Sequence, residues 1–327
     1  MTEKVRWGIL GCGWIAHSFV KALQTLPDAV VTAVASRTPG KADHFADQYG
    51  VAVRYTAYEE LVADTNVDVV YVATTHNFHH DNVTLCLNGG KHVLCEKPFT
   101  VNAIQARELA ALARKKNLFL MEAVWTRFIP AIRLLTEQLA AGTLGEIYSV
   151  EADFRIHVPY DPNHRLYKRE LAGGALLDLG IYPLTFADIV FREKPVSVTS
   201  QAIIGKTGVD ESSYYFLEYA GERLARLSAS CRTFTPHRAL IAGSRGYIEV
   251  PHFFFPEEFH VHLHDGKEET VRRPFRVNGY EYEAEETMRC IKEGLTQSPL
   301  LPVAKTIELL ELMDGLRKAW GLRYPGE

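Results

Sequence analysis

Hydrophobic and polar positions alternate in two different ways along the chain. In roughly the first 125 residues, short runs made almost entirely of apolar residues alternate with segments of helical period. The apolar runs predict strands over residues 5–10, 29–35, 67–73, 92–95 and 119–123. The helical segments between them cover residues 15–26, 42–49, 80–88 and 102–116. Apolar strands alternating with helices indicate an α/β domain whose parallel sheet is covered on both faces.

From about residue 126 the period changes from helical to twofold. After one helix expected over 130–141, the alternating runs cover residues 147–157, 196–204, 213–219, 224–231 and 259–264. A last helix is expected over 304–320. This pattern predicts an α+β region with a mostly antiparallel sheet. Because 327 residues exceed what a single core usually spans, we expect one domain over residues 1–123 and a second over 124–327.

Composition narrows the classes of protein. With 47% hydrophobic and 23% charged residues the chain has the composition of an ordinary globular protein, and its net charge of −4 gives no electrostatic case for binding nucleic acid or an anionic membrane. We expect no membrane span and no secretory leader, because no long apolar run and no basic segment followed by an apolar core is found. Five cysteines without a CxxC pair favour reduced thiols and a cytoplasmic location.

The first predicted strand leads directly into a glycine loop, Gly11-Cys12-Gly13-Trp14-Ile15-Ala16. Such a GxGxxA pattern is specific only where it joins a strand to a helix at the start of a βαβ unit, and that is its context here. The first glycine permits a tight turn, and the second lets the backbone approach a pyrophosphate at the helix N-terminus. The loop therefore predicts a dinucleotide site formed by Gly11, Gly13, Trp14 and Ile15.

The end of the second strand distinguishes NADP from NAD. An NAD site usually has an acid there to hold the ribose hydroxyls, whereas this strand continues into Ser36-Arg37 and has no acid before Asp43. A guanidinium forks onto a phosphate and a serine hydroxyl donates to it. We therefore expect NADP, with use of NAD left open.

Three segments resemble the glucose–fructose oxidoreductase/inositol dehydrogenase (Gfo/Idh/MocA) family. They are the loop GCGWIA, the stretch ATTHNFHHDNVTLCLNGGKHVLCEKPF, and GGALLDLGIYPL. Within the family, MEAVWTRFIP is most similar to the branch of dimeric dihydrodiol dehydrogenase and NADP-dependent D-xylose dehydrogenase. The resemblance implies a Rossmann domain, a second domain with an open-faced sheet, and hydride transfer between NAD(P) and a hydroxyl or carbonyl carbon.

Lys97 follows the predicted strand at 92–95, where a charged residue needs a partner or a role. Ligands of a parallel doubly wound sheet bind beyond the carboxyl ends of its strands, so Lys97 is expected to face the cleft. The resemblance implies that Lys97 contacts the nicotinamide side and the reacting hydroxyl. Glu96 can offset its charge or hold the nicotinamide ribose.

Asp178 and Tyr182 are the second pair of candidate catalytic residues. They are four residues apart and would share one face of a helix, although Pro183 weakens that helix by excluding a bond to the carbonyl of Leu179. The family often has His at the last position, and Tyr there matches the dihydrodiol dehydrogenase and glucose–fructose oxidoreductase branches. We expect Tyr182 to be the acid/base, tuned by the Lys97 ammonium, and Asp178 to orient Lys97 or a substrate hydroxyl. Lys97 as the proton acceptor is a close alternative.

Further contacts with the ligands are expected from two regions. The loop that begins with Thr74 should border the nicotinamide ribose through His76 and His79, and we rank His79 above His76. Aromatic faces at Trp125 and Phe154 suit a sugar ring or a cyclic diol, although plain core packing explains them equally well.

The histidines of FHVHLH share one face of a strand, but no nearby acid or cysteine completes a metal shell, and we expect no metal. An antiparallel sheet with one open face predicts a homodimer or higher oligomer through the second domain. The predicted function is an NADP-dependent oxidoreductase acting on a sugar or a trans-dihydrodiol. A non-catalytic NAD(P)-binding regulator and a reductase of imines or of biliverdin-type tetrapyrroles remain alternatives.

Overall fold

The computed structural model describes residues 4–327, which form two compact units. The first unit contains the chain up to Trp125 together with Arg276–Leu310, and the second contains Thr126–Phe275 together with Glu311–Glu327. A late segment of the chain, Arg276–Leu310, therefore belongs to the first unit.

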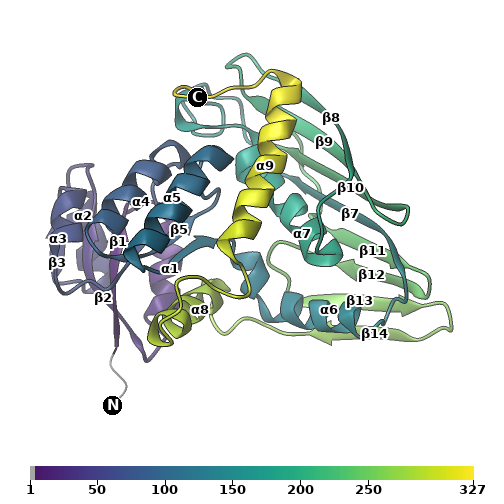
Figure 1. The fold of residues 1–327 in the computed structure, drawn as a ribbon, viewed down its shortest axis with the longest axis horizontal. Coiled ribbons are helices and arrows are strands. Elements are labelled where there is room, and N and C mark those ends of the chain that lie inside the picture. The colour runs from purple at the N-terminus through teal and green to yellow at the C-terminus, as the bar shows by residue number, and fades with distance from the viewer. Residues whose placement is uncertain (1–3) are drawn as a thin grey trace. The chain divides into compact units, whose positions relative to one another are not determined.

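The first unit is built on a parallel six-stranded sheet with the strand order β3-β2-β1-β4-β5-β6 (Figure 1). The strands are β1 (Val5–Leu10), β2 (Ala29–Ala35), β3 (Val53–Tyr55), β4 (Val69–Val72), β5 (His92–Glu96) and β6 (Leu120–Ala123). β4 is fully buried along its length, as expected for a strand covered on both faces. The order reverses direction between β1 and β4, where an open parallel sheet binds its ligand. The predicted α/β fold of this region is confirmed.

Helices flank the strands of this sheet. They are α1 (Trp14–Leu23), α2 (Lys41–Tyr49), α3 (Tyr58–Ala63), α4 (His79–Asn88), α5 (Ala103–Lys116) and α8 (Tyr280–Lys292), with a 3₁₀ turn over His76–Phe78. The ends of α5 show why the sequence located it well. The Asn102 side chain accepts the Gln105 amide at the N-terminus, and Asn117 adopts a left-handed conformation at the C-terminus.

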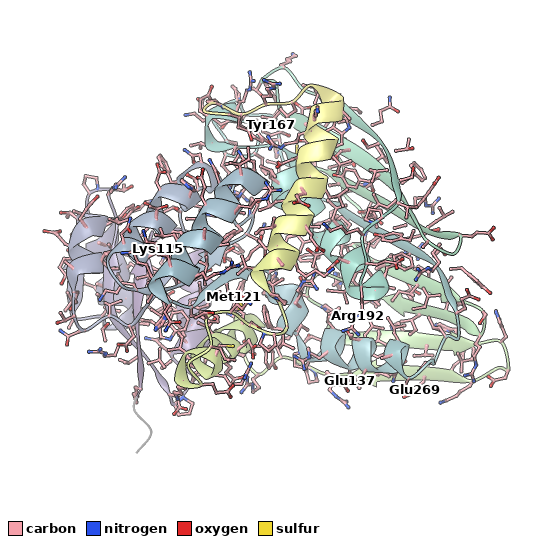
Figure 2. All side chains as sticks on the ribbon, viewed as in Figure 1. Lys115, Met121, Glu137, Tyr167, Arg192 and Glu269 are labelled. Atoms are coloured by element: carbon pink, nitrogen blue, oxygen red, sulfur yellow. The ribbon has the colours of Figure 1, made fainter. Side chains whose placement is uncertain are left out.

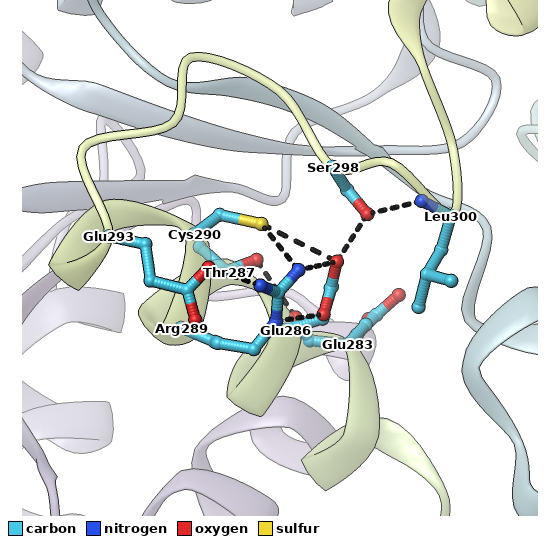
Figure 3. Close-up of polar contacts among 8 residues, drawn as sticks. All are labelled: Glu283, Glu286, Thr287, Arg289, Cys290, Glu293, Ser298 and Leu300. Atoms are coloured by element: carbon cyan, nitrogen blue, oxygen red, sulfur yellow. Dashed lines mark hydrogen bonds and ion pairs between the residues drawn. The ribbon is translucent and has the colours of Figure 1, made fainter.

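Helix α8 was missed by the sequence reading because acids occupy its buried face. Glu281, Glu283 and Glu286 are all buried, so the apolar stripe that marks an amphipathic helix is interrupted. Glu286 accepts hydrogen bonds from Arg289 and from Ser298, 2.5 Å away, and Ser298 in turn accepts the Leu300 amide (Figure 3). These contacts join α8 to the turn that follows it.

The second unit contains an eight-stranded sheet in the order β14-β13-β12-β11-β7-β10-β9-β8. Its strands are β7 (Ile147–Arg155), β8 (Ser197–Ile204), β9 (Asp210–Tyr219), β10 (Arg223–Ser230), β11 (Ala239–Gly243), β12 (Gly246–Val250), β13 (Glu258–Leu263) and β14 (Glu268–Arg272). All neighbours are antiparallel except β7 and β10, which pair in parallel. The predicted mostly antiparallel sheet is confirmed.

One face of this sheet carries helices α6 (Pro130–Ala140) and α7 (Ile181–Phe191) (Figure 1). The last helix, α9 (Val303–Trp320), contributes its second half to this unit. Strand β9 shows the twofold pattern directly, because Tyr215 and Leu217 are buried whereas Tyr214 and Phe216 are exposed. The helices therefore cover one set of alternating residues and leave the other set in solvent.

Two further features of this unit are its apolar stretch before β8 and the histidines of FHVHLH. The stretch Arg169–Phe191 is long and apolar enough to cross a membrane by composition, but 94% of its most apolar window is buried in the structure. Such burial is what a core helix shows. Glu258 lies 3.5 Å from the His260 ring and Glu268 lies 3.3 Å from that of His262, but no group of three or more His, Cys, Asp or Glu side chains among residues 4–327 is placed to hold a metal ion. Strand β14 supplies Glu268 and was not foreseen.

Candidate active site

The glycine loop joins β1 to α1 and is held against the end of β4. Gly11 has φ +99°, and a Cβ there would lie 2.7 Å from the Ala73 carbonyl oxygen. Any side chain at Gly11 is therefore excluded both by backbone conformation and by space. Gly13 precedes α1, whose first turn has neither a capping side chain nor an acid among its residues. Its amide groups and the dipole of α1 suit a phosphate.

Ser36 and Arg37 follow β2 on the same side of the sheet as the glycine loop. The Arg37 guanidinium lies over the Tyr58 ring, 4.4 Å from its centroid, and only 3.4 Å from a carboxylate oxygen of the exposed Glu59. Stacking fixes the plane of the guanidinium while its outer edge stays accessible, which suits a fork onto phosphate. Ser36 is buried, and its hydroxyl oxygen accepts the Thr38 amide.

The loop after β4 places His79 in the interior of the first unit. His79 has no exposed surface, and its ring nitrogens lie 2.8 Å from the Pro98 carbonyl oxygen and 3.1 Å from that of Thr74. Burial lowers the pKa of His79 to about 4, so the ring is neutral and donates from one nitrogen. His79 lies between the Thr74 loop and the strand end that carries Lys97. Its role as a cofactor contact stays a prediction.

Glu96 and Lys97 end strand β5. Glu96 is buried and accepts a short hydrogen bond from the Tyr71 hydroxyl, while its other oxygen accepts the Lys97 amide at 3.2 Å. Lys97 itself is half-buried and precedes a cis peptide bond to Pro98. Glu96 thus fixes the backbone of Lys97 rather than lying free at the surface. The location of Lys97 beyond a strand's carboxyl end agrees with the sequence argument.

A second buried acid, Glu283, accompanies Glu96 and was not predicted. Glu283 has no exposed surface, and neither of its carboxyl oxygens has a hydrogen-bond partner among residues 4–327. Burial and the negative charge of Glu96 raise the pKa of Glu283 well above its usual range. Both effects favour the protonated form of Glu283. No sequence signal identifies it, because Glu283 and Glu96 are distant along the chain.

Trp125 is buried with its ring stacked on Tyr280, at 4.3 Å between centroids and an angle of 6° between planes. Tyr280 begins α8 in the same unit. The sequence predicts that Trp125 lines the substrate site, but it gives no signal for Tyr280, the ring that stacks on it.

In the second unit, Asp178 lies in a single π-helical turn, Leu176–Gly180, that leads directly into α7. Pro183 falls in the first turn of α7, so the weak point predicted for this helix coincides with the irregular turn. Asp178 is buried and accepts a hydrogen bond from Arg165, 2.9 Å away. Arg165 comes from the loop between β7 and α7 and was not predicted. In that loop Tyr167, labelled in Figure 2, donates to the Val158 carbonyl oxygen at 2.7 Å.

Tyr182 lies in a cluster of aromatic rings. Phe154 meets Tyr182 edge-on at 5.2 Å and stacks on Phe254 at 4.1 Å. His237 meets Phe154 edge-on at 4.8 Å, and its Nε2 lies 2.6 Å from the Arg155 carbonyl oxygen. The structure thus brings Phe154 and Tyr182 together and adds Phe254 and His237. Phe254 belongs to the run Phe253-Phe254-Phe255, which lies between β12 and β13. Phe253, its neighbour, is fully buried core.

Comparison with known proteins identifies relatives along the whole chain. A model described as "Oxidoreductase family, NAD-binding Rossmann fold" matches residues 5–124, and the GFO/IDH/MocA C-terminal domain matches residues 132–249. The chain is 39% identical to trans-1,2-dihydrobenzene-1,2-diol dehydrogenase of Xenopus tropicalis, over 98% of this chain and 99% of that protein.

Two solved structures, each with a nucleotide bound, have a similar fold. KijD10, a 3-ketoreductase from Actinomadura kijaniata in complex with NADP and TDP-benzene, has a TM-score of 0.87 and 27% identity over 97% of this chain and 98% of that one. Levoglucosan dehydrogenase in complex with NADH and levoglucosan has a TM-score of 0.87 at 19% identity, over 98% of both chains, and shows the fold alone. The predicted resemblance and the predicted NAD(P)-dependent oxidoreductase are confirmed: this chain belongs to the GFO/IDH/MocA oxidoreductase family.

Proposed function

We propose that this protein transfers a hydride between NADP(H) and the carbon of a hydroxyl or carbonyl group in a trans-dihydrodiol or a sugar. The observation that carries the proposal is the setting of Tyr182, whose ring lies against Phe154 and Phe254, four residues from the buried Asp178. Flat apolar faces beside a hydroxyl and a carboxylate suit a ring that bears vicinal hydroxyls. The similarity to trans-1,2-dihydrobenzene-1,2-diol dehydrogenase supports the dihydrodiol as the first substrate to test.

In the proposed oxidation, Tyr182 accepts the proton of the substrate hydroxyl as its carbon loses a hydride. A dinucleotide held at the glycine loop and by Arg37 would supply the acceptor for that hydride, and in the reverse direction Tyr182 would return the proton. A free tyrosine titrates near pH ~10, so an efficient base at neutral pH requires a neighbouring cation. Lys97 is the proposed cation, and the proposal requires Lys97 and Tyr182 to reach the same substrate oxygen. Asp178, oriented by Arg165, is proposed to hold a second hydroxyl of the substrate.

The finer choice of NADP rests on Arg37 and Ser36. The glycine loop provides a close backbone approach for a pyrophosphate, since nothing larger than glycine is accommodated at Gly11. Arg37 presents a stacked guanidinium where an NAD site usually has an acid. Thr74 and His76 are proposed to border the nicotinamide ribose, and Trp125 to line the substrate side.

The test of this proposal is a panel of trans-dihydrodiols, aldoses and dicarbonyls assayed by NADP(H) absorbance. Turnover of a cyclic diol or an aldose with NADP is the expected result. If no hydroxyl or carbonyl compound is turned over while NADPH still binds, the alternative of a non-catalytic regulator is favoured. If NADPH is consumed only with an imine or a linear tetrapyrrole, the protein is instead a reductase of imines or of biliverdin-type tetrapyrroles.

We also propose that the uncovered face of the eight-stranded sheet binds a second copy of the chain. Neighbouring strands present exposed apolar side chains on this face, namely Tyr214, Phe216, Leu224 and Tyr247. A second copy is favoured because the same residues would cover each other across a twofold axis. Light scattering at micromolar concentration should give a dimer or a larger assembly, and Phe216→Glu should shift it toward the monomer. A monomeric mass for the unaltered chain contradicts the proposal.

A further inference from the structure

Strand β9 supplies a set of buried polar side chains that the proposed chemistry does not use. Asp210, the first residue of β9, has no exposed surface. Its Oδ2 accepts the Leu176 amide at 2.7 Å. Leu176 begins the π-helical turn that carries Asp178, so the Asp210 carboxylate is bonded directly to the start of the proposed catalytic segment, residues 173–182.

The glycines that precede this turn fit closely against the same carboxylate. Gly174 has φ +118°, and a Cβ there would lie 2.3 Å from the Asp210 Oδ1 and 3.2 Å from the Tyr324 hydroxyl. The Tyr324 hydroxyl also donates to the Gly173 carbonyl oxygen at 2.5 Å. Only glycine satisfies both the positive φ and the available space at residue 174.

The other end of the turn is fixed from the same strand. A Cβ on Gly180 would lie 2.6 Å from the Tyr215 hydroxyl, so the backbone passes directly over that group. The Ser213 hydroxyl lies 2.5 Å from the Tyr215 hydroxyl and 3.4 Å from the Asp210 Oδ2. One strand therefore contacts the segment on both sides of Asp178, through side chains that also contact one another.

This arrangement has a cost that packing alone does not explain. The Asp210 Oδ1 has no hydrogen-bond partner among residues 4–327, and burial of a carboxyl group without full pairing is unfavourable. An apolar residue of similar size would avoid that cost but would leave the Leu176 amide unpaired. The carboxylate and its neighbours thus stabilise one backbone path through a π-helical turn, a geometry that is rare and concentrated at functional sites.

We infer that Asp210, with Ser213 and Tyr215, is a positioning residue that sets the backbone of residues 173–182 and so directs the polar atoms of Asp178 and Tyr182 toward the substrate. The inference rests on the proposed function for the roles of Asp178 and Tyr182. It does not depend on that function for the effect on the backbone, which can be measured by itself.

The first test compares Asp210→Ala, Asp210→Asn and Tyr215→Phe with Tyr219→Phe, a control that removes the hydroxyl of another buried tyrosine of β9. Asp210→Ala should lower kcat about 10- to 100-fold with an unchanged Kd for NADPH, because a small displacement of reacting groups is enough for such a loss. Asp210→Asn keeps an acceptor for the Leu176 amide, so its kcat should be within about 3-fold of that of the unaltered enzyme. A 3-fold change in kcat is well below the change expected from the loss of one catalytic contact. Tyr215→Phe should lower kcat, and Tyr219→Phe should not.

The second test measures hydrogen exchange in peptides that cover residues 173–182. Asp210→Ala should accelerate exchange there and leave the glycine loop unchanged. If Asp210→Ala does not fold, hydrogen exchange in residues 173–182 is compared between Tyr215→Phe and Tyr219→Phe, and that comparison tests the inference. Unchanged kcat and unchanged exchange in Asp210→Ala, or in Tyr215→Phe where that variant decides, would overturn the inference. A loss in Asp210→Asn as large as that in Asp210→Ala would also overturn it, because the acceptor would then not be the cause.

A third measurement uses pH. Burial raises the pKa of Asp210 from 3.8 to about 7, while the groups that face it include Arg317, Tyr215, Tyr324 and Cys231. The folded state binds this proton more tightly than the unfolded state, so its contribution to stability is present below pH 4 and is lost as pH rises to about 7. In Asp210→Asn that part of the pH dependence should disappear, and an identical slope in both proteins contradicts the assigned environment. If no hydroxyl or carbonyl compound is turned over, the proposed function fails, but hydrogen exchange in residues 173–182 still tests the role of Asp210.

Discussion

The glycine loop of the first unit and the segment 173–182 of the second unit both begin with glycines that no other residue can replace, but they are held in different ways. Around Gly11 the constraint is local: the strand end, the turn and the helix start follow one another, and the nearest obstacle is the Ala73 backbone. Around Gly174 the constraint comes from side chains far along the chain, Asp210 and Tyr324. A site made of backbone can therefore be recognised in sequence, whereas a site made of distant side chains needs the fold.

The same contrast applies to charge. Arg37 is exposed and anchored by a neighbouring ring, as a ligand-binding cation must be. Asp178, in contrast, is buried with Arg165 as its partner. A carboxylate that is already paired and buried is suited to orienting a substrate, because it does not need to reorganise when the substrate binds.

The largest effect should come from Lys97→Met, which removes the cation without removing the length of the side chain. Turnover should fall about 10²- to 10⁴-fold, as expected for the loss of an acid/base unit. Binding of NADPH should weaken only as far as Lys97 contacts the nicotinamide side. Stopped-flow fluorescence measures both the turnover rate and the Kd for NADPH. Lys91→Met is the control, since Lys91 donates to the Asp64 and Val67 carbonyl oxygens away from this strand end. Turnover near that of the unaltered enzyme in Lys97→Met contradicts the assignment.

The second-largest effect is expected in the glycine loop. Gly11→Ala should weaken binding of NADPH and NADH alike by about 10- to 100-fold, because a strained left-handed residue costs roughly 1–3 kcal/mol. Isothermal titration measures both affinities. Gly50→Ala is the matched control, since Gly50 also has a positive φ but has no atom near its added Cβ. Equal losses of cofactor affinity in the two variants would mean that the close approach at Gly11 has no part in binding.

A smaller, selective effect is expected at the end of β2. Arg37→Ala should raise the Michaelis constant for NADP about 10-fold or more and leave that for NAD nearly unchanged, because a charge-assisted pair contributes roughly 1.5–3 kcal/mol. Steady-state kinetics with both cofactors at saturating substrate gives the ratio. Arg54→Ala, at an exposed ion pair with Asp47, provides the control. An equal change for both cofactors removes the case for NADP.

How much of the molecule could be predicted follows from this contrast. The parallel sheet, the glycine loop and the position of Lys97 depend on local runs of residues, and the sequence located them. Helix α8 and the acid Glu283 were missed, because their buried carboxyl groups look like surface residues in a linear pattern. Arg165, Phe254 and His237 join the Tyr182 cluster only through the pairing of distant strands. The cytoplasmic location and the two-domain boundary at residue 123 stay predictions.

The proposed hydride-transfer chemistry depends most directly on the hydroxyl of Tyr182. The decisive measurement is single-turnover hydride transfer by Tyr182→Phe with cofactor and substrate at saturation, followed across pH. Removing only the hydroxyl keeps the ring against Phe154 and Phe254, so the cluster should remain intact. We expect the rate of hydride transfer to fall by a factor of about 10²–10⁴ and the affinity for NADPH to stay unchanged. Hydride transfer within a few-fold of the unaltered enzyme at every pH would contradict this expectation and assign the proton to Lys97.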